Sequence, residues 1–586
     1  MKPIVKCFFL FPILLLNIIA CKRDWLKPEP LSTLTTENVY TNKEGFVSLL
    51  VTMRKNLKNE SYGDINFTVC EYAASDLGVP ITQLDFYKLT PNTDRYYKFL
   101  SMYTTAYKCI KDANVLISRI DNISWEDKKQ RDALVAEAYW HRAYWYYRLV
   151  NSYGDVPWIG EEIVGAKLDF QTYSRWPILD KLKSDLEYAV QWLPVSAPPG
   201  VISQGAGYHL LAKVDIAALK FDNAIEAASK VINGPYSLMT KRFGADINNV
   251  KYNVIWDLHR PQNMNIPQNT ETILATVDRF EAPPGAKSTG LYTMRLYNCA
   301  WWNSSVKDSK GQVGTVLSGP IKDTLGRGNA NVRLNPFYEY EVWAFGNQTW
   351  RNTPDLRRSN SNWMDIEEII YNNPASVDYG KPINISNYAS LADTLYTLFA
   401  MPTYITYVQQ EDPKALPYGG NGDWYVFRLA DTYLIRAEAY YWKGQLDLAA
   451  NDINKVRQRA NALPVSSGNI TLDFIFDERA RELFGESPRH SELVRASYIL
   501  ASLNRNGYSL SNFSDKNYYY DRVEKLNILY KQKVSLIGNT ANIAPFHVLW
   551  PIPASVILTN TLGKINQNVK YDGADKNIPP LTAPIK

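Results

Sequence analysis

The segment from Leu134 to Ile159 constrains the fold of this chain more than any other. Its first part predicts a helix, because apolar residues recur every three or four positions among good helix formers. The aromatic residues of this helix leave almost no polar face: Tyr139, Trp140, Tyr144, Trp145, Tyr146 and Tyr147. A helix that is hydrophobic nearly all round must be sandwiched between other elements. Gly154 and Pro157 end the helix, so the segment predicts the core helix of an all-α protein.

The amino terminus is typical of an export signal. Two lysines lie among the first six residues, and the apolar run from Cys7 to Ala20 that follows is too short for a comfortable membrane span. The run ends in Ile18-Ile19-Ala20-Cys21, which looks like a bacterial lipobox. We predict that residues 1–20 are a lipoprotein signal peptide and that Cys21 is lipidated, which would tether an otherwise soluble protein to a membrane. A plain secretory signal that contains a cysteine is the alternative.

The composition limits the classes of function. The formal charge is +5, and Lys2 and Lys6 would leave with the signal, so the mature chain is too mildly basic for a nucleic-acid-binding protein. Aromatic residues make up 13% of the chain, with 40 Tyr and 16 Trp, a surplus that suggests a binding surface. Cys70, Cys109 and Cys299 remain, which excludes a disulfide scaffold. They do not cluster with histidine, and the sequence assigns no metal ligands and no cofactor.

Two segments, 208–231 and 433–456, carry similar residues in register. Each places tyrosine, small alanines, a bulky residue and Lys-Val at equivalent positions, a spacing that resembles the tetratricopeptide repeat of stacked helical hairpins. Gly444 lies in the turn of the second copy, whereas the first copy has no glycine there, so its turn must be built differently. Two units are too few for a stable stack, and we assign further helices near 96–120, 125–152 and 173–193. Unrelated hairpins with coincidental alanines are the alternative.

Several stretches, together with the aromatic helix, resemble the SusD/RagB family of surface glycan-binding lipoproteins of Bacteroidetes-like bacteria. They run in family order from about residue 21 to about 571. The stretches are Trp25-Leu26-Lys27-Pro28, Thr36-Glu37-Asn38-Val39-Tyr40, Arg333-Leu334-Asn335-Pro336, Asp355-Leu356-Arg357, Glu478-Arg479-Ala480-Arg481-Glu482-Leu483, Arg489-His490-Ser491-Glu492-Leu493-Val494-Arg495, Leu549-Trp550-Pro551-Ile552-Pro553 and Asn566-Gln567-Asn568.

The resemblance implies a mainly α fold, a tetratricopeptide-like hairpin stack with a large irregular, loop-rich insert. On this basis we expect an N-terminal helical region over 21–240, an aromatic-rich insert over 241–422 that holds the ligand, and a closing C-terminal region over 423–586. Family members work with a SusC-like TonB-dependent transporter, a barrel over which they sit as a lid, and the resemblance implies this partner here. The resemblance implies an outer-membrane lipoprotein that faces the cell surface. The mixed charges of Lys22-Arg23-Asp24, where surface-exported relatives often carry acidic residues, leave the periplasmic face as the alternative.

Candidate ligand residues are those that could cover the apolar face of a sugar ring or hydrogen-bond its rim. The densest group is Tyr292, Tyr297, Trp301, Trp302 and Asn303. Adjacent Trp301 and Trp302 should face opposite ways, so one of them should lie at a surface. A second group, early in the chain, is Asp76, Asp85, Tyr87, Tyr96 and Tyr97, and a third is Trp343, Trp350 and Arg351.

Catalysis is not indicated by any motif. The chain has no Gly-x-Ser-x-Gly elbow, phosphate loop or His-Glu-x-x-His. Glu478 and Glu482 share a helix face but stand among arginines, which favours ion pairing. We therefore predict a non-catalytic protein that captures an oligo- or polysaccharide and passes it to the transporter. A RagB-like peptide-binding lipoprotein and a tetratricopeptide-type protein-interaction scaffold remain the alternatives.

Overall fold

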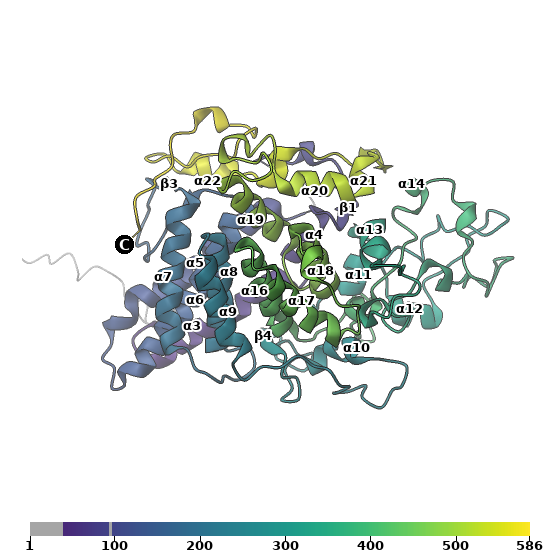
Figure 1. Cartoon of the computed structure of the whole chain (residues 1–586), viewed down its shortest axis with the longest axis horizontal. Coiled ribbons are helices and arrows are strands. Elements are labelled where there is room, and N and C mark those ends of the chain that lie inside the picture. Colours follow the sequence, from purple (N-terminus) through teal and green to yellow (C-terminus); the bar gives the residue numbers. More distant parts are fainter. Residues whose placement is uncertain (1–38, 93–96, 586) are drawn as a thin grey trace, which may run out of the picture.

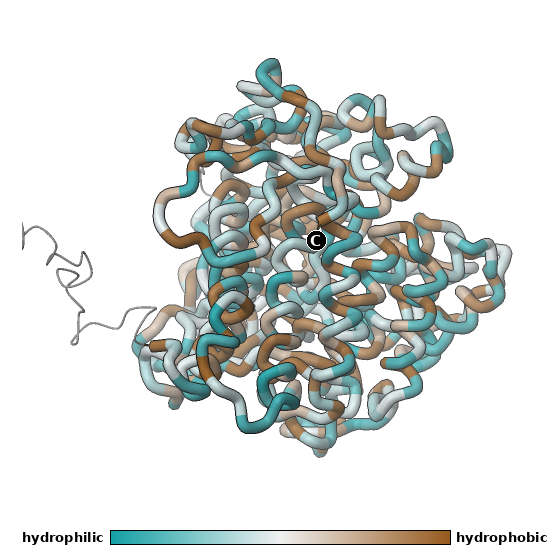
Figure 2. Tube along the Cα trace, turned by 90° about the vertical axis from the view of Figure 1, so that its left-hand side faces the viewer, coloured by the Kyte–Doolittle hydropathy of each residue, from teal (hydrophilic) through white to brown (hydrophobic). Residues whose placement is uncertain are grey.

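The structure, a computed structural model, describes residues 39–92 and 97–585. The predicted signal peptide, Cys21 and Tyr96 lie outside these residues. The protein is mainly helical, with a stack of long helices on one side and irregular chain on the other (Figure 1). No helix within the described ranges is long and apolar enough to cross a membrane, and hydrophilic and hydrophobic stretches alternate along the chain in Figure 2.

The aromatic segment forms α6, Lys128–Ser152, as predicted. The Asp127 side chain accepts a hydrogen bond from the backbone N–H of Lys129 and so caps the start of the helix. Gly154, with φ +71°, turns the chain just beyond its end. The helix lies between α5, Phe99–Arg119, and α7, Arg175–Trp192, and its tryptophans are completely buried. The sandwiched position inferred from its aromatic faces is confirmed.

The two repeats join into one continuous stack across the insert. Each helix packs on the next in the order α5, α6, α7, α8, α9, α16 and α17 (Figure 1). The last helix of the first repeat thus contacts the first helix of the second, although about two hundred residues separate them in sequence. The bounds are α8 Gln204–Ala217, α9 Phe221–Ile232, α16 Leu429–Trp442 and α17 Leu446–Arg459, followed by α18 Leu472–Leu483, α19 Arg489–Ser502 and α20 Tyr518–Leu526. The predicted hairpin stack is confirmed.

The two hairpin turns use different residues for the same backbone shape. Gly444 has φ +75°, and Leu219, the equivalent residue of the first repeat, has φ +63°. Hydrogen bonds of the same pattern close both turns: Leu219 N donates to Ile216 O at 3.0 Å, and Gly444 N donates to Tyr441 O at 3.0 Å. Leucine rarely adopts this left-handed conformation, so the first turn holds strain that the glycine turn avoids.

The insert consists of short elements joined by long loops, as predicted, and two small sheets fasten it to the stack. Strand β4, Thr272–Thr276, pairs antiparallel with β6, Trp424–Arg428, which closes the base of the insert. Strand β1, Gly78–Pro80, pairs with β5, Val332–Leu334, which ties the insert to the early chain. The short helices are α10 Val254–Leu258, α11 Thr293–Tyr297, α12 Gly319–Leu325, α13 Pro336–Glu339, α14 Leu391–Thr394 and α15 Thr403–Thr406. The exact boundaries of the insert remain a prediction.

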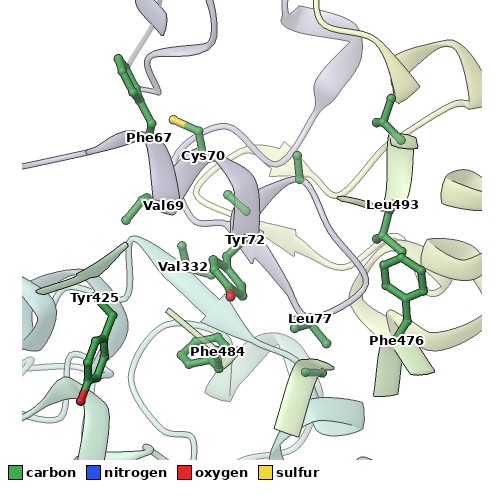
Figure 3. Close-up of a cluster of buried hydrophobic side chains, with 14 of the residues drawn as sticks. Phe67, Val69, Cys70, Tyr72, Leu77, Val332, Tyr425, Phe476, Phe484 and Leu493 are labelled. Atoms are coloured by element: carbon green, nitrogen blue, oxygen red, sulfur yellow. The ribbon is translucent and has the colours of Figure 1, made fainter. Parts of the chain in front are cut away.

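One core joins the three parts of the chain, and Tyr72 lies at its centre (Figure 3). Tyr72, from α4, Phe67–Ala73, packs edge-on against Phe484, with ring centroids 4.7 Å apart. Its hydroxyl accepts a hydrogen bond from the backbone N–H of Gly485 at 2.9 Å and donates to the carbonyl oxygen of Ser487. Val332 of β5 lies beside it in the same cluster. The insert and the stack are therefore parts of one packed body.

Candidate functional site

Four of the predicted aromatic ligand residues are buried, and one of them is Tyr97 of the second group, which has no exposed surface. Trp301 has no exposed surface, and its Nε1 donates to the carbonyl oxygen of Gly326 at 3.1 Å. Trp343 is 2% exposed and donates to the carbonyl oxygen of Tyr338, while the buried ring of Tyr297 packs edge-on against both Tyr72 and Phe484. A ring without an open face cannot stack on a sugar, so these four belong to the core. Trp302 is half-buried, so of the two adjacent tryptophans it is the one that keeps some exposed surface.

Asp76 is also buried, and its carboxylate pairs with two arginines. Its carboxylate is fully enclosed and accepts hydrogen bonds from Arg489 Nε at 2.8 Å, Arg489 Nη2 at 2.6 Å and Arg522 Nε at 2.6 Å. Burial raises the pKa of this carboxyl, but the two guanidinium groups outweigh burial and bring the pKa down to about 2. Asp76 is therefore a permanent buried anion that holds α19 and α20 to the early chain, with no group left to meet a ligand.

Half-buried aromatic and arginine side chains gather on the insert. We define the aromatic–arginine surface as Tyr292, Arg295, Trp302, Arg327 and Tyr418. The rings of Tyr292 and Tyr418 meet edge-on with centroids 5.4 Å apart, and the Arg295 guanidinium lies 4.6 Å from the centre of the Tyr418 ring. Arg327 lies over Trp302 at 4.3 Å and donates from Nη1 to the Tyr418 hydroxyl at 3.3 Å. The five side chains thus form one connected surface.

Backbone hydrogen bonds join the loops beneath this surface. Arg295 N donates to the carbonyl oxygen of Tyr418 at 3.0 Å, and Arg327 N donates to that of Pro417 at 2.8 Å. Gly290, with φ +111°, lets two loops approach, because a Cβ at this position would lie 2.7 Å from the carbonyl oxygen of Gly419. Trp302 is fixed by a hydrogen bond of 2.8 Å from its Nε1 to the carbonyl oxygen of Gly328. The rings are therefore held in place by tertiary hydrogen bonds.

The early chain reaches the same surface. The Tyr97 hydroxyl donates to the carbonyl oxygen of Asn331, and Lys98 Nζ donates to the carbonyl oxygen of Asp64 at 3.2 Å. Asp64 in turn pairs with Arg295 at 3.1 Å. The early chain thus contacts the aromatic–arginine surface through Asp64 and Arg295, while Tyr97, of the second predicted group, is buried.

The other predicted residues lie apart from these contacts. Tyr87 is 54% exposed and packs edge-on against Phe546 and His547. Asp85 caps the turn that holds Tyr87, and Asn303 caps its own turn by accepting from Ser305 N at 2.9 Å. Trp350 is half-buried beside Tyr340, with Arg351 and Arg358 over its ring at 4.0 and 4.6 Å. Their roles in binding stay predictions.

Glu478 and Glu482, which share a face of α18, lie buried among arginines. Glu478 pairs with Arg357, Arg457 and Arg481, and Glu482 pairs with Arg357, Arg428 and Arg459. Burial opposes ionisation of both carboxyls, but the surrounding arginines bring the pKa of Glu482 to about 2 and hold the pKa of Glu478 well below its ordinary value. The predicted ion pairing is confirmed. Within the part of the chain that the structure describes, no group of three or more His, Cys, Asp or Glu could hold a metal ion.

Sequence reasoning missed Arg327 and Tyr418 as parts of the surface. Arg327 follows a glycine in a loop, and Tyr418 lies more than a hundred residues beyond Tyr292. No local pattern connects them to the aromatic run at 292–303. Only the loop pairing through Pro417 and Gly419 places them there.

Two family models match the chain. Residues 24–216 match a model described as "Starch-binding associating with outer membrane", and residues 339–571 match the SusD family. A SusD-like protein of Formosa agariphila is 23% identical over 95% of this chain and 97% of its own. The starch-binding protein SusD of Bacteroides thetaiotaomicron is 32% identical over a shorter stretch, 25% of this chain and 21% of its own.

Solved structures agree on the fold. A laminarin-binding SusD-like protein aligns with TM-score 0.60 and 19% identity, covering 91% of this chain and 100% of its own. A surface glycan-binding protein A of Bacteroides thetaiotaomicron, in complex with laminarihexaose, aligns with TM-score 0.59 and 17% identity over 90% of this chain and 100% of its own. The fold is thus that of the SusD-like outer-membrane-associated proteins. The chain belongs to the SusD/RagB family.

Proposed function

We propose that this protein is a non-catalytic, lipid-anchored outer-membrane protein that captures an oligo- or polysaccharide on its aromatic–arginine surface. The observation that carries the proposal is the surface itself: three half-buried aromatic rings stand beside two guanidinium groups. Aromatic faces cover the C–H side of a sugar ring, while guanidinium and hydroxyl groups hydrogen-bond its rim. The relatives named as starch- or laminarin-binding support a glucan as the first ligand to test.

Delivery to a SusC-like TonB-dependent transporter completes the proposed function. The helical stack would dock the barrel, and the insert would hold the glycan and act as the lid. Anchoring at Cys21 would keep the two proteins in one membrane and raise their effective concentration. Affinity purification of the tagged, lipidated protein from the native membrane should bring down a large outer-membrane barrel. A preparation that reproducibly contains no barrel would refute this part.

The test of the site is calorimetry on residues 22–586 with laminarin, starch and other glycan oligomers. Replacing Trp302 or Tyr418 with alanine should weaken binding by about 2 kcal/mol, or ~30-fold in Kd, as for an aromatic hot spot. Tyr379→Ala is the matched control, because Tyr379 is a 59% exposed tyrosine of the same insert outside the surface. Its Kd should stay unchanged.

Other binding results would move the site to a different part of the protein or change the class of ligand. Loss of binding in Tyr87→Ala, with Trp302→Ala unaffected, would move the site to the exposed ring beside Phe546. Binding of peptides instead of glycans would refute the saccharide proposal in favour of a RagB-like protein. Failure of the protein to bind either class would leave a protein-interaction scaffold.

A further inference from the structure

An apolar cavity lies between α5, the segment 157–170 and the C-terminal segment that carries α22, Ala554–Thr559. Its volume is about 370 Å³, which is within the range of small-molecule sites. Most of its wall consists of apolar and aromatic side chains, among them Tyr107, Ile110, Ile163, Phe170, Val556 and Ile565. All of these but Ile110 and Ile565 are half-buried, so a ligand can reach them from solvent. None of them belongs to the aromatic–arginine surface.

Two polar side chains in this wall are already bonded within the protein. The Tyr107 hydroxyl donates to the carbonyl oxygen of Pro157 at 2.6 Å, and Asn114 Nδ2 donates to that of Ile159 at 2.8 Å. Asn114 Oδ1 accepts from Arg142 Nη1 at 3.1 Å. A sugar in this cavity would give up hydrogen bonds to water and gain few in return. The cavity therefore suits a ligand with an apolar body rather than a saccharide.

The edge of the cavity carries a small excess of positive charge. Lys108 and Lys111 are exposed, lie one turn apart on α5, and form no ion pair with a described residue. Glu161 also lines the cavity and is exposed, so two ammonium groups face one carboxylate. An exposed ammonium group attracts an anionic head group without having to be buried. Apolar walls with lysines at the edge match an amphipathic anion.

Further apolar side chains of the same two segments are exposed to solvent. Leu562 N donates to the carbonyl oxygen of Leu168 at 2.8 Å, which sets the two segments side by side. Leu558 and Leu562 are 75% and 77% exposed, and Val164 is also exposed. Exposed apolar side chains gathered in one region mark a surface that meets an apolar partner or a membrane.

The cavity lies near the part of the chain that leads to the proposed lipid anchor. Tyr40 is close to Arg119 and Glu162, and Glu162 lies between Glu161 and Ile163 of the cavity lining. At most about 65 Å of extended chain joins Tyr40 to Cys21. Lipids of the membrane that would hold the anchor are therefore within reach of the cavity.

We propose that this cavity is a lipid-binding site, which takes the acyl chain of an amphipathic anion. The acyl chain lies against the apolar wall, and the carboxylate or phosphate of the head group meets Lys108 and Lys111. A free fatty acid and an anionic phospholipid share this chemistry. The inference rests on the proposed function only for the membrane anchor at Cys21, and it uses none of the side chains proposed to bind the glycan.

Displacement of a fluorescent fatty acid, dansylated undecanoic acid, from residues 22–586 tests the inference. Wild-type protein should bind this probe in the micromolar range, and decanoic acid should displace it. Thr104→Trp should weaken binding at least about tenfold, because Thr104 is a half-buried residue of the wall and a larger side chain would exclude two or more methylene groups of the ligand.

The head-group contact is tested with decanoic acid and decanol, which share a chain and differ in charge. Lys108→Gln combined with Lys111→Gln should weaken binding of decanoic acid about tenfold and leave that of decanol within about twofold. Lys128→Gln combined with Lys129→Gln is the matched control, because these two exposed lysines lie outside the cavity. It should change neither ligand's affinity.

Vesicles of phosphatidylethanolamine and phosphatidylglycerol distinguish the two sources of the acyl chain. If a membrane lipid is the ligand, wild-type protein should co-sediment with the vesicles, and Leu558→Glu combined with Leu562→Glu should reduce this at least about fivefold. Val250→Glu combined with Ile537→Glu, at two exposed apolar residues elsewhere, is the control. Binding of decanoic acid without binding of vesicles would identify a free fatty acid.

The inference is overturned if neither decanoic acid nor the vesicles bind, or if Thr104→Trp leaves the binding of both unchanged. All of the substituted residues are exposed or half-buried, so the variants should stay folded. Protein that binds a glucan but no lipid would overturn the inference and leave the proposed function standing. Protein that binds lipid but no glycan would do the reverse.

Discussion

Replacing Asp76 with asparagine removes a buried negative charge and leaves two buried guanidinium groups facing an amide. In the folded protein the pKa of Asp76 falls from its ordinary 3.8 to about 2, which corresponds to ~2.5 kcal/mol of preferential interaction with the ionised form. Breaking a buried ion pair by removing one partner commonly costs 3–5 kcal/mol. Arg522 also pairs with Asp473 and Asp477, whereas Arg489 has only Asp76 as its ion-pair partner among the described residues. We therefore expect Asp76→Asn to lower the free energy of unfolding by about 3 kcal/mol.

The assay is urea unfolding followed by circular dichroism, with Glu367→Gln as the control. Glu367 pairs with Arg351 at 2.6 Å, the same distance as Asp76 to Arg489, but both side chains of the Glu367–Arg351 pair are more than half exposed. Screening by water should limit that change to about 0.5 kcal/mol. Because the pKa of Asp76 is lowered in the folded state, its stabilisation is complete above about pH 4 and is lost as the pH falls through 2. A change below about 1 kcal/mol, or loss of glycan binding without loss of stability, would refute the structural role.

Further predictions concern the turns and the core. Gly444→Ala should destabilise the protein by about 1 kcal/mol in thermal or urea unfolding, since φ is +75° and a Cβ would meet no atom within 4 Å; an unchanged midpoint would show that the left-handed turn holds no strain. Burial lowers the pKa of His490, which stacks on Trp550, from 6.5 to about 4. Because the unfolded chain takes up this proton at a higher pH than the folded protein does, ~3 kcal/mol of stability should be lost as the pH falls from 6.5 to 4. His490→Gln should flatten this part of the pH–stability curve, and an unaltered slope would contradict the assignment.

The fold was largely predictable, because its strongest signals are local. The faces of α6 are aromatic all round, and the repeats at 208–231 and 433–456 carry the alanines that allow close helix packing. Such periodic patterns determine which faces must be buried. The turn at Leu219 was less predictable in detail. Sequence indicated only that it differs from the glycine turn, and the structure shows that leucine adopts the same left-handed backbone.

The candidate site was only partly predictable. The aromatic run at 292–303 contains both core and surface residues, and alternation separates Trp301 from Trp302 without saying which one is buried. Asp76 has the chemistry of a sugar ligand, but Arg489 and Arg522 arrive from more than four hundred residues away to neutralise it. Its role therefore depended on contacts that no local pattern specifies.

The sequence by itself determined the class of fold, the helical repeats and the family, because these rest on spacing within short segments. Only the tertiary structure decided which aromatic rings are buried and that Arg327 and Tyr418 join Trp302 and Tyr292. The physical reason is that the exposure of a side chain, and the neutralisation of its charge, depend on residues from segments that are distant in the sequence. Residue type gives the chemistry that a side chain can offer, and packing decides whether that chemistry is already satisfied within the protein.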